Sequence, residues 1–344
     1  MTPAPGCGVQ VAFTTGGQHR PAMGPAVWMR DNCVCPQCRD PHSGQRLIAL
    51  ADIPDDIAVV GVDGTSVTFS DGHRGELGAP PGLGDGRTEA GKTLWDSAEV
   101  PRWTWREYLD DPVPAARAVW ELGFCLLTGT PAQPGAVLAV ARSFGHVRTT
   151  NYGELFDVRV EARPTNLAFT GLAIGPHTDN PYRDPVPTVQ LLHCLRNSAE
   201  GGESGLLDGF RAAALLRERH PGYFRVLTTT PVTFAWADGT TSLRAEKPII
   251  DVDPLGRIRE VRYNHRSLRP PASAEFYAAY RAFDELLNRP GATVTFRLDP
   301  GDCVIFDNTR MMHSRTAFTA ANERHLQGCY ADLDALQTFL EEPR

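Results

Sequence analysis

The sequence predicts a mainly β protein with flanking helices, in which a sandwich or barrel follows a smaller β-rich domain. Two patterns lead to this fold class: many short β-prone segments are separated by Gly/Pro-rich turns, and few segments have the period of a helix. The third observation is the length, because 344 residues exceed what one hydrophobic core usually supports.

The N-terminal part is predicted to consist of short strands. β-branched and aromatic side chains, which favour strands, concentrate in Val9–Phe13, Ala26–Met29, Ile57–Val62 and Ser66–Phe69. Asp63-Gly64 lies between the last two of these segments, and this residue pair favours a tight turn with positive φ angles. We therefore expect a hairpin there.

A linker is predicted over residues 78–94, which contain Gly and Pro and almost no bulky apolar side chains. A segment of this composition buries little apolar surface and favours an extended connection. We therefore expect an N-terminal domain over residues 1–90 and a second domain over residues 95–344.

The C-terminal part is predicted to be richer in strands than in helices. Helices are expected at Pro112–Leu122, Ala136–Phe144, Phe210–Arg219 and Ala272–Asn288. Strands are expected at Phe124–Thr128, Val158–Val160, Val189–Cys194, Gly205–Leu207, Val232–Trp236, Ile249–Val252, Ile258–Tyr263, Ala292–Arg297 and Cys303–Asp307. An antiparallel sandwich or barrel of this kind can bring segments together that lie far apart in the sequence.

Composition and charge exclude two classes of partner. The net charge is −7 and no Lys/Arg block has the density of a nucleic-acid-binding stripe, so no nucleic acid is expected. Apolar runs such as Val189–Leu192 are too short to span a bilayer, and residues 1–8 lack the basic and apolar regions of a signal peptide. We expect a cytoplasmic protein that has no membrane contact.

Three of the eight cysteines form a cluster at Cys33, Cys35 and Cys38. In a reducing compartment such closely spaced thiols seldom lack a metal or redox role, and one further ligand would complete a tetrahedral structural zinc site. His73 is the first candidate for the fourth ligand and His42 is the alternative. The competing interpretation is three ordinary buried thiols.

A second metal site, for iron, is predicted at His177, Asp179 and His313. The first two residues are separated by one position, and alternate residues of a strand point to the same side. His313 follows the predicted strand Asp302–Asp307 and a turn over Asn308–Met312. Two imidazoles and one carboxylate leave three positions open around Fe(II), which suits a chelating co-substrate and O₂.

The residues around these ligands favour an oxygenase over two rival interpretations. Arg324 lies eleven residues after His313, where its guanidinium could pair with the distal carboxylate of a 2-oxo diacid, and Ser204 could add a hydroxyl. A zinc hydrolase on the same ligands would need a general base and would have no use for Arg324. A catalytically silent protein of the same fold would not need the complete ligand set.

Several strings of this sequence carry a family resemblance. They are Trp28–Cys35, His177–Tyr182, Gln190–Cys194, Asp208–Phe210, Phe306–Asn308 and Arg324–Asp332. Together they resemble the family of γ-butyrobetaine dioxygenase and trimethyllysine dioxygenase, and they extend over most of the chain.

The resemblance implies a double-stranded β-helix, or jelly roll, that follows a zinc-binding module in the sequence. It implies hydroxylation of an unactivated C–H bond while 2-oxoglutarate is converted to succinate and CO₂. It places the fourth zinc ligand on His73 and the 2-oxoglutarate carboxylate on Arg324. A homodimer is a further expectation from the resemblance.

The resemblance also implies a small-molecule substrate with a quaternary ammonium group, held in an aromatic cage through its attraction to ring faces. The matching positions are Tyr152, Phe156, Phe169 and Tyr330. Phe156 stands where γ-butyrobetaine dioxygenase has a Trp, and Phe169 where it has a Tyr. The competing interpretation is that both Phe residues belong to the core.

Four residues are candidates for contacts to the anionic end of the substrate. Asn166 aligns with a family Asn that has this role, and Tyr182 and Asn264 are further candidates. Arg266 departs from the butyrobetaine pattern and suggests a more highly charged anion, such as a phosphonate, unless it is a surface-loop Arg. γ-Butyrobetaine, a trimethylammonium alkylphosphonate and trimethyllysine are therefore all candidate substrates.

Overall fold

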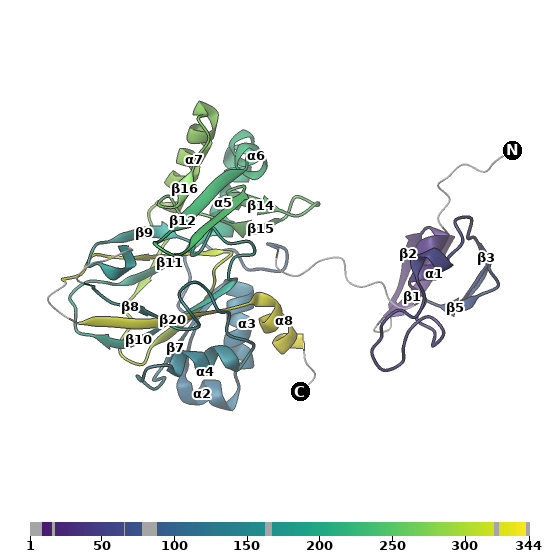
Figure 1. Ribbon diagram of the computed structural model, residues 1–344, viewed down its shortest axis with the longest axis horizontal. Helices are drawn as coiled ribbons and strands as arrows, with labels where there is room; N and C mark the ends of the chain where they lie inside the picture. The colour runs from purple at the N-terminus through teal and green to yellow at the C-terminus, as the bar shows by residue number, and fades with distance from the viewer. Residues whose placement is uncertain are drawn as a thin grey trace. The chain divides into compact units, whose positions relative to one another are not determined.

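The computed structural model describes residues 9–15, 18–64, 66–77, 88–161, 167–319 and 323–341 (Figure 1). The chain divides into two compact units, Met1–Asp85 and Gly86–Arg344. Among the described residues, no helix has the length and apolar character needed to cross a membrane.

The N-terminal unit consists of two small antiparallel sheets and one short helix. β1 (Val9–Thr15) pairs with β2 (Gln18–Gly24), α1 (Ala26–Asp31) follows, and η1 (Leu50–Asp52) precedes the sheet of β3 (Val59–Asp63), β4 (Ser66–Phe69) and β5 (Arg74–Glu76). Its core consists of Met29, Ile53, Ile57, Val67, Phe69 and Leu77.

The prediction of a strand at Ala26–Met29 is wrong, because this segment forms the helix α1. Pro25 precedes the helix with an extended backbone, and the N–H of Asn32 closes the end by donating to the Trp28 carbonyl. A short apolar run cannot be assigned to helix or strand from its periodicity alone. Here the helix places Met29 in the core.

Two facing sheets form the centre of the C-terminal unit. The large sheet has the order β6 (Arg102–Thr104), β7 (Phe124–Thr128), β18 (Cys303–Asp307), β10 (Val189–Asn197), β20 (Arg324–Ala331) and β8 (Phe156–Val158). The small sheet has the order β17 (Val294–Phe296), β11 (Ser204–Asp208), β19 (Met311–Arg315) and β9 (Ile174–His177). One hydrophobic cluster takes side chains from both sheets, including Leu126, Leu206, Phe306, Met311 and Leu326. The predicted double-stranded β-helix is thereby confirmed.

Helices cover the outside of this sandwich in two groups (Figure 1). α2 (Trp105–Asp110), α3 (Val113–Leu122), α4 (Ala136–Arg142) and α8 (Leu333–Glu341) share a hydrophobic cluster with β7, β10, β18 and β20. α5 (Gly209–Arg219), α6 (Pro221–Thr229) and α7 (Ala274–Leu287) pack with β12 (Val232–Ala237), β14 (Ile250–Val252), β15 (Ile258–Val261) and β16 (Leu268–Arg269). β13 (Ser242–Lys247) pairs with β12, and η2 (Leu167–Phe169) lies between β8 and β9.

Two boundaries differ from the predictions. The turn expected over Asn308–Met312 is shorter, because β19 begins at Met311 and carries His313 inside the strand. The predicted linker lies partly outside the described residues, but its last part packs on the C-terminal unit. Glu89 forms an ion pair with Arg217 there. These contacts depend on partners far along the chain, so the local composition could not show them.

Candidate active site and zinc cluster

Two paired strands bring the three predicted iron ligands together. His177 at the end of β9 lies directly opposite His313 on the antiparallel strand β19. The Nε2 atoms of His177 and His313 lie 3.5 and 3.9 Å from Oδ1 of Asp179. One possible ligand atom from each residue therefore lies within 4.8 Å of the other two.

Hydrogen bonds orient two of these three side chains, His177 and Asp179, toward one point. Nδ1 of His177 lies 3.0 Å from the Gly175 carbonyl oxygen, so we assign the proton to Nδ1 and the lone pair to Nε2. Oδ2 of Asp179 accepts hydrogen bonds from Gln190 at 2.8 Å and from the Tyr330 hydroxyl at 2.9 Å. Oδ1 is therefore the oxygen that faces the two imidazoles.

Asn308 holds the backbone of Asp179 in place from the turn between β18 and β19. Its side-chain oxygen accepts from the Asp179 N–H at 2.8 Å, and its Nδ2 donates to the Asp179 carbonyl at 3.0 Å. The same Nδ2 donates to the carbonyl of Pro187 at 2.9 Å. The ligand geometry is thus fixed by the protein itself, which is what a preorganised metal site requires.

The electrostatics of the site favour the ligand forms that bind a divalent cation. Burial opposes ionisation of Asp179, but His313, His177 and the hydrogen bond from Tyr330 outweigh it and hold the pKa of the carboxyl below its usual range. Burial, with His177 beside it, lowers the pKa of His313 to about 3. A carboxylate on Asp179 and a neutral imidazole on His313 at neutral pH fit Fe(II).

These ligands face a cavity of about 400 Å³, and five of its aromatic lining residues form one connected group. Ring centroids of Tyr152 and Phe156 are 6.1 Å apart, and those of Phe156 and Tyr330 are 5.1 Å apart. Trp236 lies 5.7 Å from Tyr152 and 5.7 Å from Tyr182. We refer to these five residues as the aromatic cluster.

With one exception, the structure places all residues predicted to contact iron, co-substrate or substrate at this cavity. The lining includes His177, Asp179, His313, Ser204, Arg324, Tyr152, Phe156, Phe169, Tyr182, Asn264, Arg266 and Tyr330. The exception is Asn166, which lies outside the described residues. Phe156 and Phe169 are half-buried and belong to none of the hydrophobic core clusters, which argues against a purely structural role for them.

The lining carries an excess of positive charge. Arg266, Arg315 and Arg324 all reach the cavity, whereas Asp179 is the single acidic residue among its described lining. Burial lowers the pKa of Arg324 to about 10, which still leaves it a cation at neutral pH. In the described part of the chain, the guanidinium groups of Arg266 and Arg324 have neither a hydrogen-bond acceptor nor a carboxylate partner. Both are therefore available to anionic ligands.

The lining residues that reasoning from the sequence missed include Asn180, Trp236 and Arg315. Asn180 has a φ of 53°, and both polar atoms of its buried amide have no partner among the described residues. Its signal was an Asn directly after an iron ligand, since Asn tolerates the left-handed region. Trp236 gave no local signal, because only the pairing of β12 with its neighbours brings it to the cavity.

The cysteine cluster of the N-terminal unit is arranged for a tetrahedral ion. Nε2 of His73 lies 3.4, 3.7 and 3.5 Å from the Sγ atoms of Cys33, Cys35 and Cys38. Zinc–sulfur and zinc–nitrogen bonds at tetrahedral angles give an S···N separation of about 3.6 Å. A methyl group on Gly75 would lie 2.4 Å from Sγ of Cys33, so the strand β5 closes the site tightly. The residues fit structural zinc.

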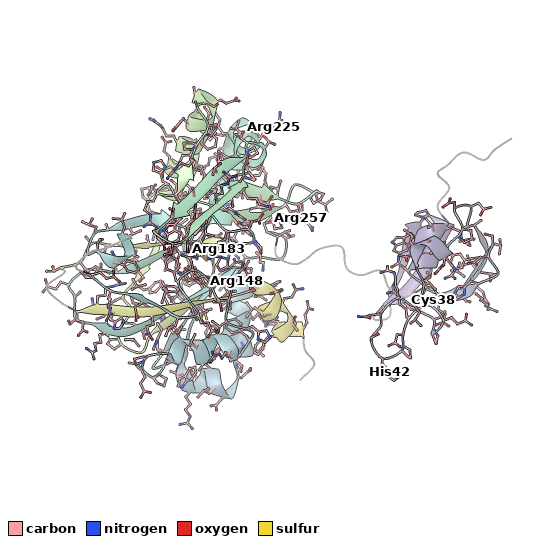
Figure 2. All side chains as sticks on the ribbon, viewed as in Figure 1. Cys38, His42, Arg148, Arg183, Arg225 and Arg257 are labelled. Carbon is pink, nitrogen blue, oxygen red and sulfur yellow. The ribbon has the colours of Figure 1, made fainter. Side chains whose placement is uncertain are left out.

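His73, and not the alternative His42, completes this cluster. His42 lies in an exposed turn, where its N–H donates to Asp40 (Figure 2). The wild-type protein should bind about one equivalent of zinc. We expect His73→Ala to lose most of this zinc and His42→Ala to keep it. Metal analysis of the purified variants checks this. Zinc retained in His73→Ala at the wild-type level would contradict the assigned ligand set.

Comparisons with known proteins find a family match in each of the two units. Residues 88–330 match the family described as taurine catabolism dioxygenase TauD, TfdA family, and residues 6–77 match gamma-butyrobetaine hydroxylase-like, N-terminal. Gamma-butyrobetaine dioxygenase of Pseudomonas sp. strain AK-1 is 35% identical over 338 residues, which cover 90% of this chain and 88% of that protein. Trimethyllysine dioxygenase of Meyerozyma guilliermondii is 27% identical over 350 residues, which cover 90% and 87%.

A solved structure from Burkholderia xenovorans, provisionally assigned as an alpha-ketoglutarate-dependent taurine dioxygenase, has a similar fold. Its TM-score is 0.51 at 16% identity, and the match covers 69% of this chain and 90% of that one. At this identity the likeness concerns the fold alone. The double-stranded β-helix that carries the predicted iron ligands is therefore shared with this structure.

Proposed function

Because this chain belongs to the TauD, TfdA family of dioxygenases and has a gamma-butyrobetaine hydroxylase-like N-terminal domain, we propose that it hydroxylates a small quaternary-ammonium acid. The enzyme is a 2-oxoglutarate-dependent dioxygenase that uses Fe(II) and O₂. The proposed overall reaction converts substrate, 2-oxoglutarate and O₂ into hydroxylated substrate, succinate and CO₂. Among the candidate substrates, γ-butyrobetaine is the one that we propose.

This proposal rests on the aromatic cluster, which lines the same cavity as the predicted iron ligands. It brings five rings, one of them an indole, to the cavity that also holds His177, Asp179 and His313. Ring faces attract a trimethylammonium group, which has no hydrogen to donate and gains little from polar walls. Tyr330 belongs to this cluster and also donates to Asp179, so the cluster reaches the metal ligands themselves.

The protein's part in the reaction is to bind and orient the reactants. When bound, iron supplies the oxidising chemistry, with 2-oxoglutarate as the reductant of O₂. His177, Asp179 and His313 would hold the metal, and Arg324 with Ser204 would receive the distal carboxylate of 2-oxoglutarate. The apolar lining, including Leu192 and Leu326, keeps water away from this region.

The cavity also contains hydrogen-bond donors for the anionic end of the substrate. Asn264 lines the cavity and is fixed by its Nδ2, which donates one hydrogen to the Thr178 carbonyl at 3.1 Å and has a second hydrogen for an anion. The guanidinium of Arg266 reaches the cavity without a carboxylate in the described structure. This Arg favours a second candidate, a trimethylammonium alkylphosphonate, because a dianion gains more from a guanidinium than a carboxylate does.

Substrate-stimulated succinate formation tests the proposal. Iron-loaded enzyme is incubated with 2-oxoglutarate, O₂ and either γ-butyrobetaine, trimethyllysine or a trimethylammonium phosphonate. We expect one of the three to stimulate succinate formation over the substrate-free rate. If none of them does so while 2-oxoglutarate is still consumed, the quaternary-ammonium substrate class is wrong.

Replacing Trp236 separates cation recognition from simple packing. Its indole is the strongest cation–π partner in the aromatic cluster, so we expect Trp236→Leu to raise the KM for γ-butyrobetaine roughly 5- to 30-fold. Inhibition by 5,5-dimethylhexanoate, in which an uncharged tert-butyl group replaces the trimethylammonium group, should change much less. Trp105→Leu, outside the cavity, is the matched control. Equal losses for the cation and its isostere would show that the indole contributes packing alone.

We also propose that the enzyme works as a cytoplasmic homodimer. The support for the homodimer is the family resemblance, and the free state of the described cysteines supports a reducing compartment. Sedimentation equilibrium tests the dimer, and a monomer at micromolar concentration would contradict it.

A further inference from the structure

We propose that Arg315 and Phe318 couple the binding of 2-oxoglutarate at Arg324 to the position of the cavity wall formed by residues 167–172. This inference goes beyond the proposed function, because it concerns how binding of 2-oxoglutarate affects the wall of the substrate site. It assigns positioning roles to two residues that touch neither the metal nor the reacting atoms.

Arg315 is the main anchor of this wall segment. It lies on β19 two residues after His313, and its buried guanidinium donates to the carbonyls of Ala168 at 3.2 Å, Thr170 at 2.7 Å and Leu172 at 2.7 Å. Among the described residues no carboxylate forms an ion pair with this cation. A buried guanidinium satisfied only by carbonyl dipoles is costly to form and strongly favours one geometry of its acceptors.

The wall segment has few other long-range bonds to the sheets. Its internal hydrogen bonds are local, such as the one from the Thr170 N–H to the Leu167 carbonyl at 3.1 Å. Local bonds define the shape of a turn but not its distance from the metal site. Leu167, Ala168 and Phe169 nevertheless line the cavity, so the hydrogen bonds from Arg315 place this part of the substrate site.

Phe318 connects this anchor to the co-substrate site. The guanidinium carbon of Arg315 lies 4.9 Å from the centre of the Phe318 ring, and that of Arg324 lies 5.5 Å from it. The Phe318 N–H also donates to the Gly171 carbonyl of the wall segment at 3.0 Å. One ring therefore contacts both cations, and its backbone holds the segment directly.

The electrostatics give the coupling its direction. Arg315 and Arg324 are like charges that both contact the Phe318 ring, so they repel each other across it. A dicarboxylate on Arg324 neutralises that repulsion and fixes its guanidinium against the ring. The Phe318 ring and the Arg315 hydrogen bonds then gain stability together, so the wall segment should become more ordered when 2-oxoglutarate binds.

Hydrogen exchange tests this coupling without any substrate or turnover. Protein loaded with zinc and with Mn(II) in place of iron is compared with and without 2-oxoglutarate. We expect amides in residues 167–172 to exchange roughly threefold to tenfold more slowly with 2-oxoglutarate, the range of a cation–π contribution. Exchange in α3, none of whose residues lines the cavity, should not change and serves as the internal control.

Two variants decide whether Phe318 carries the effect. Phe318→Leu should bind 2-oxoglutarate, measured by calorimetry, but lose the protection of residues 167–172, whereas Phe318→Tyr should keep both. Unchanged exchange of the wild-type segment on adding 2-oxoglutarate, or full protection in a 2-oxoglutarate-bound Phe318→Leu protein, would overturn the proposal. Failure of every quaternary-ammonium substrate would leave this test unaffected, because only 2-oxoglutarate is added.

Discussion

His177→Ala is expected to lose both iron and 2-oxoglutarate turnover. Losing a hydrogen-bonding partner of a metal ligand alone costs about 10- to 100-fold, so losing a ligand should lower succinate formation on the order of 10³-fold or more. His177, Asp179 and His313 together form the ligand set, and Asp179 with His313 alone leaves it incomplete. Iron content after purification and the rate of succinate formation are the measurements.

His220→Ala is the matched control for this variant. His220 is exposed at the junction of α5 and α6 and does not line the cavity, so its removal should change neither iron content nor turnover. A His177→Ala protein with wild-type iron content and succinate formation would show that the metal lies elsewhere.

Arg310→Met is expected to cause the largest loss of stability. The side chains of Arg310 and Asp208 are both 0% exposed, and their ion pair measures 2.8 Å. Asp208 also accepts from the Trp95 N–H and from the first turn of α5, so it cannot move to water. Leaving a buried charge unpaired lowers the free energy of unfolding by about 3–5 kcal/mol.

Denaturant unfolding of the C-terminal unit measures this loss, and two further variants define its origin. Arg310→Met combined with Asp208→Asn should recover part of the stability, because the amide keeps the helix cap without the charge. Arg211→Met removes the exposed partner of Asp96 and should cost about 1 kcal/mol or less. A loss for Arg310→Met as small as that for Arg211→Met would contradict the account of the buried pair.

Residue spacing was sufficient to predict the parts of the sites that depend on local geometry. His177 and Asp179 are separated by one position at a strand end, and three cysteines within one loop can share one ion. β4 and β18 also have their predicted bounds. The reason is again local, because alternating or continuous apolar runs identify buried strands.

Sequence reasoning failed where a residue's role depends on strand pairing over long distances. Trp236 reaches the cavity because β12 pairs with β13 and β16, and no neighbouring residue in the sequence indicates that role. Arg315 follows the iron ligand His313 closely, but its acceptors lie on a segment about 145 positions earlier, which only the fold brings near. α2 was also missed, although its capping box of Thr104 and Glu107 was a readable signal.

Labelled oxygen tests the central claim most directly. The enzyme is loaded with Fe(II) and given 2-oxoglutarate, γ-butyrobetaine and ¹⁸O₂, and the products are analysed by mass spectrometry. The account predicts one labelled oxygen atom in succinate and one in a hydroxylated quaternary-ammonium product, formed in equal amounts. Succinate that carries label while γ-butyrobetaine and the other two candidate substrates remain unmodified would contradict the claim that this cavity is built to hydroxylate a quaternary-ammonium acid.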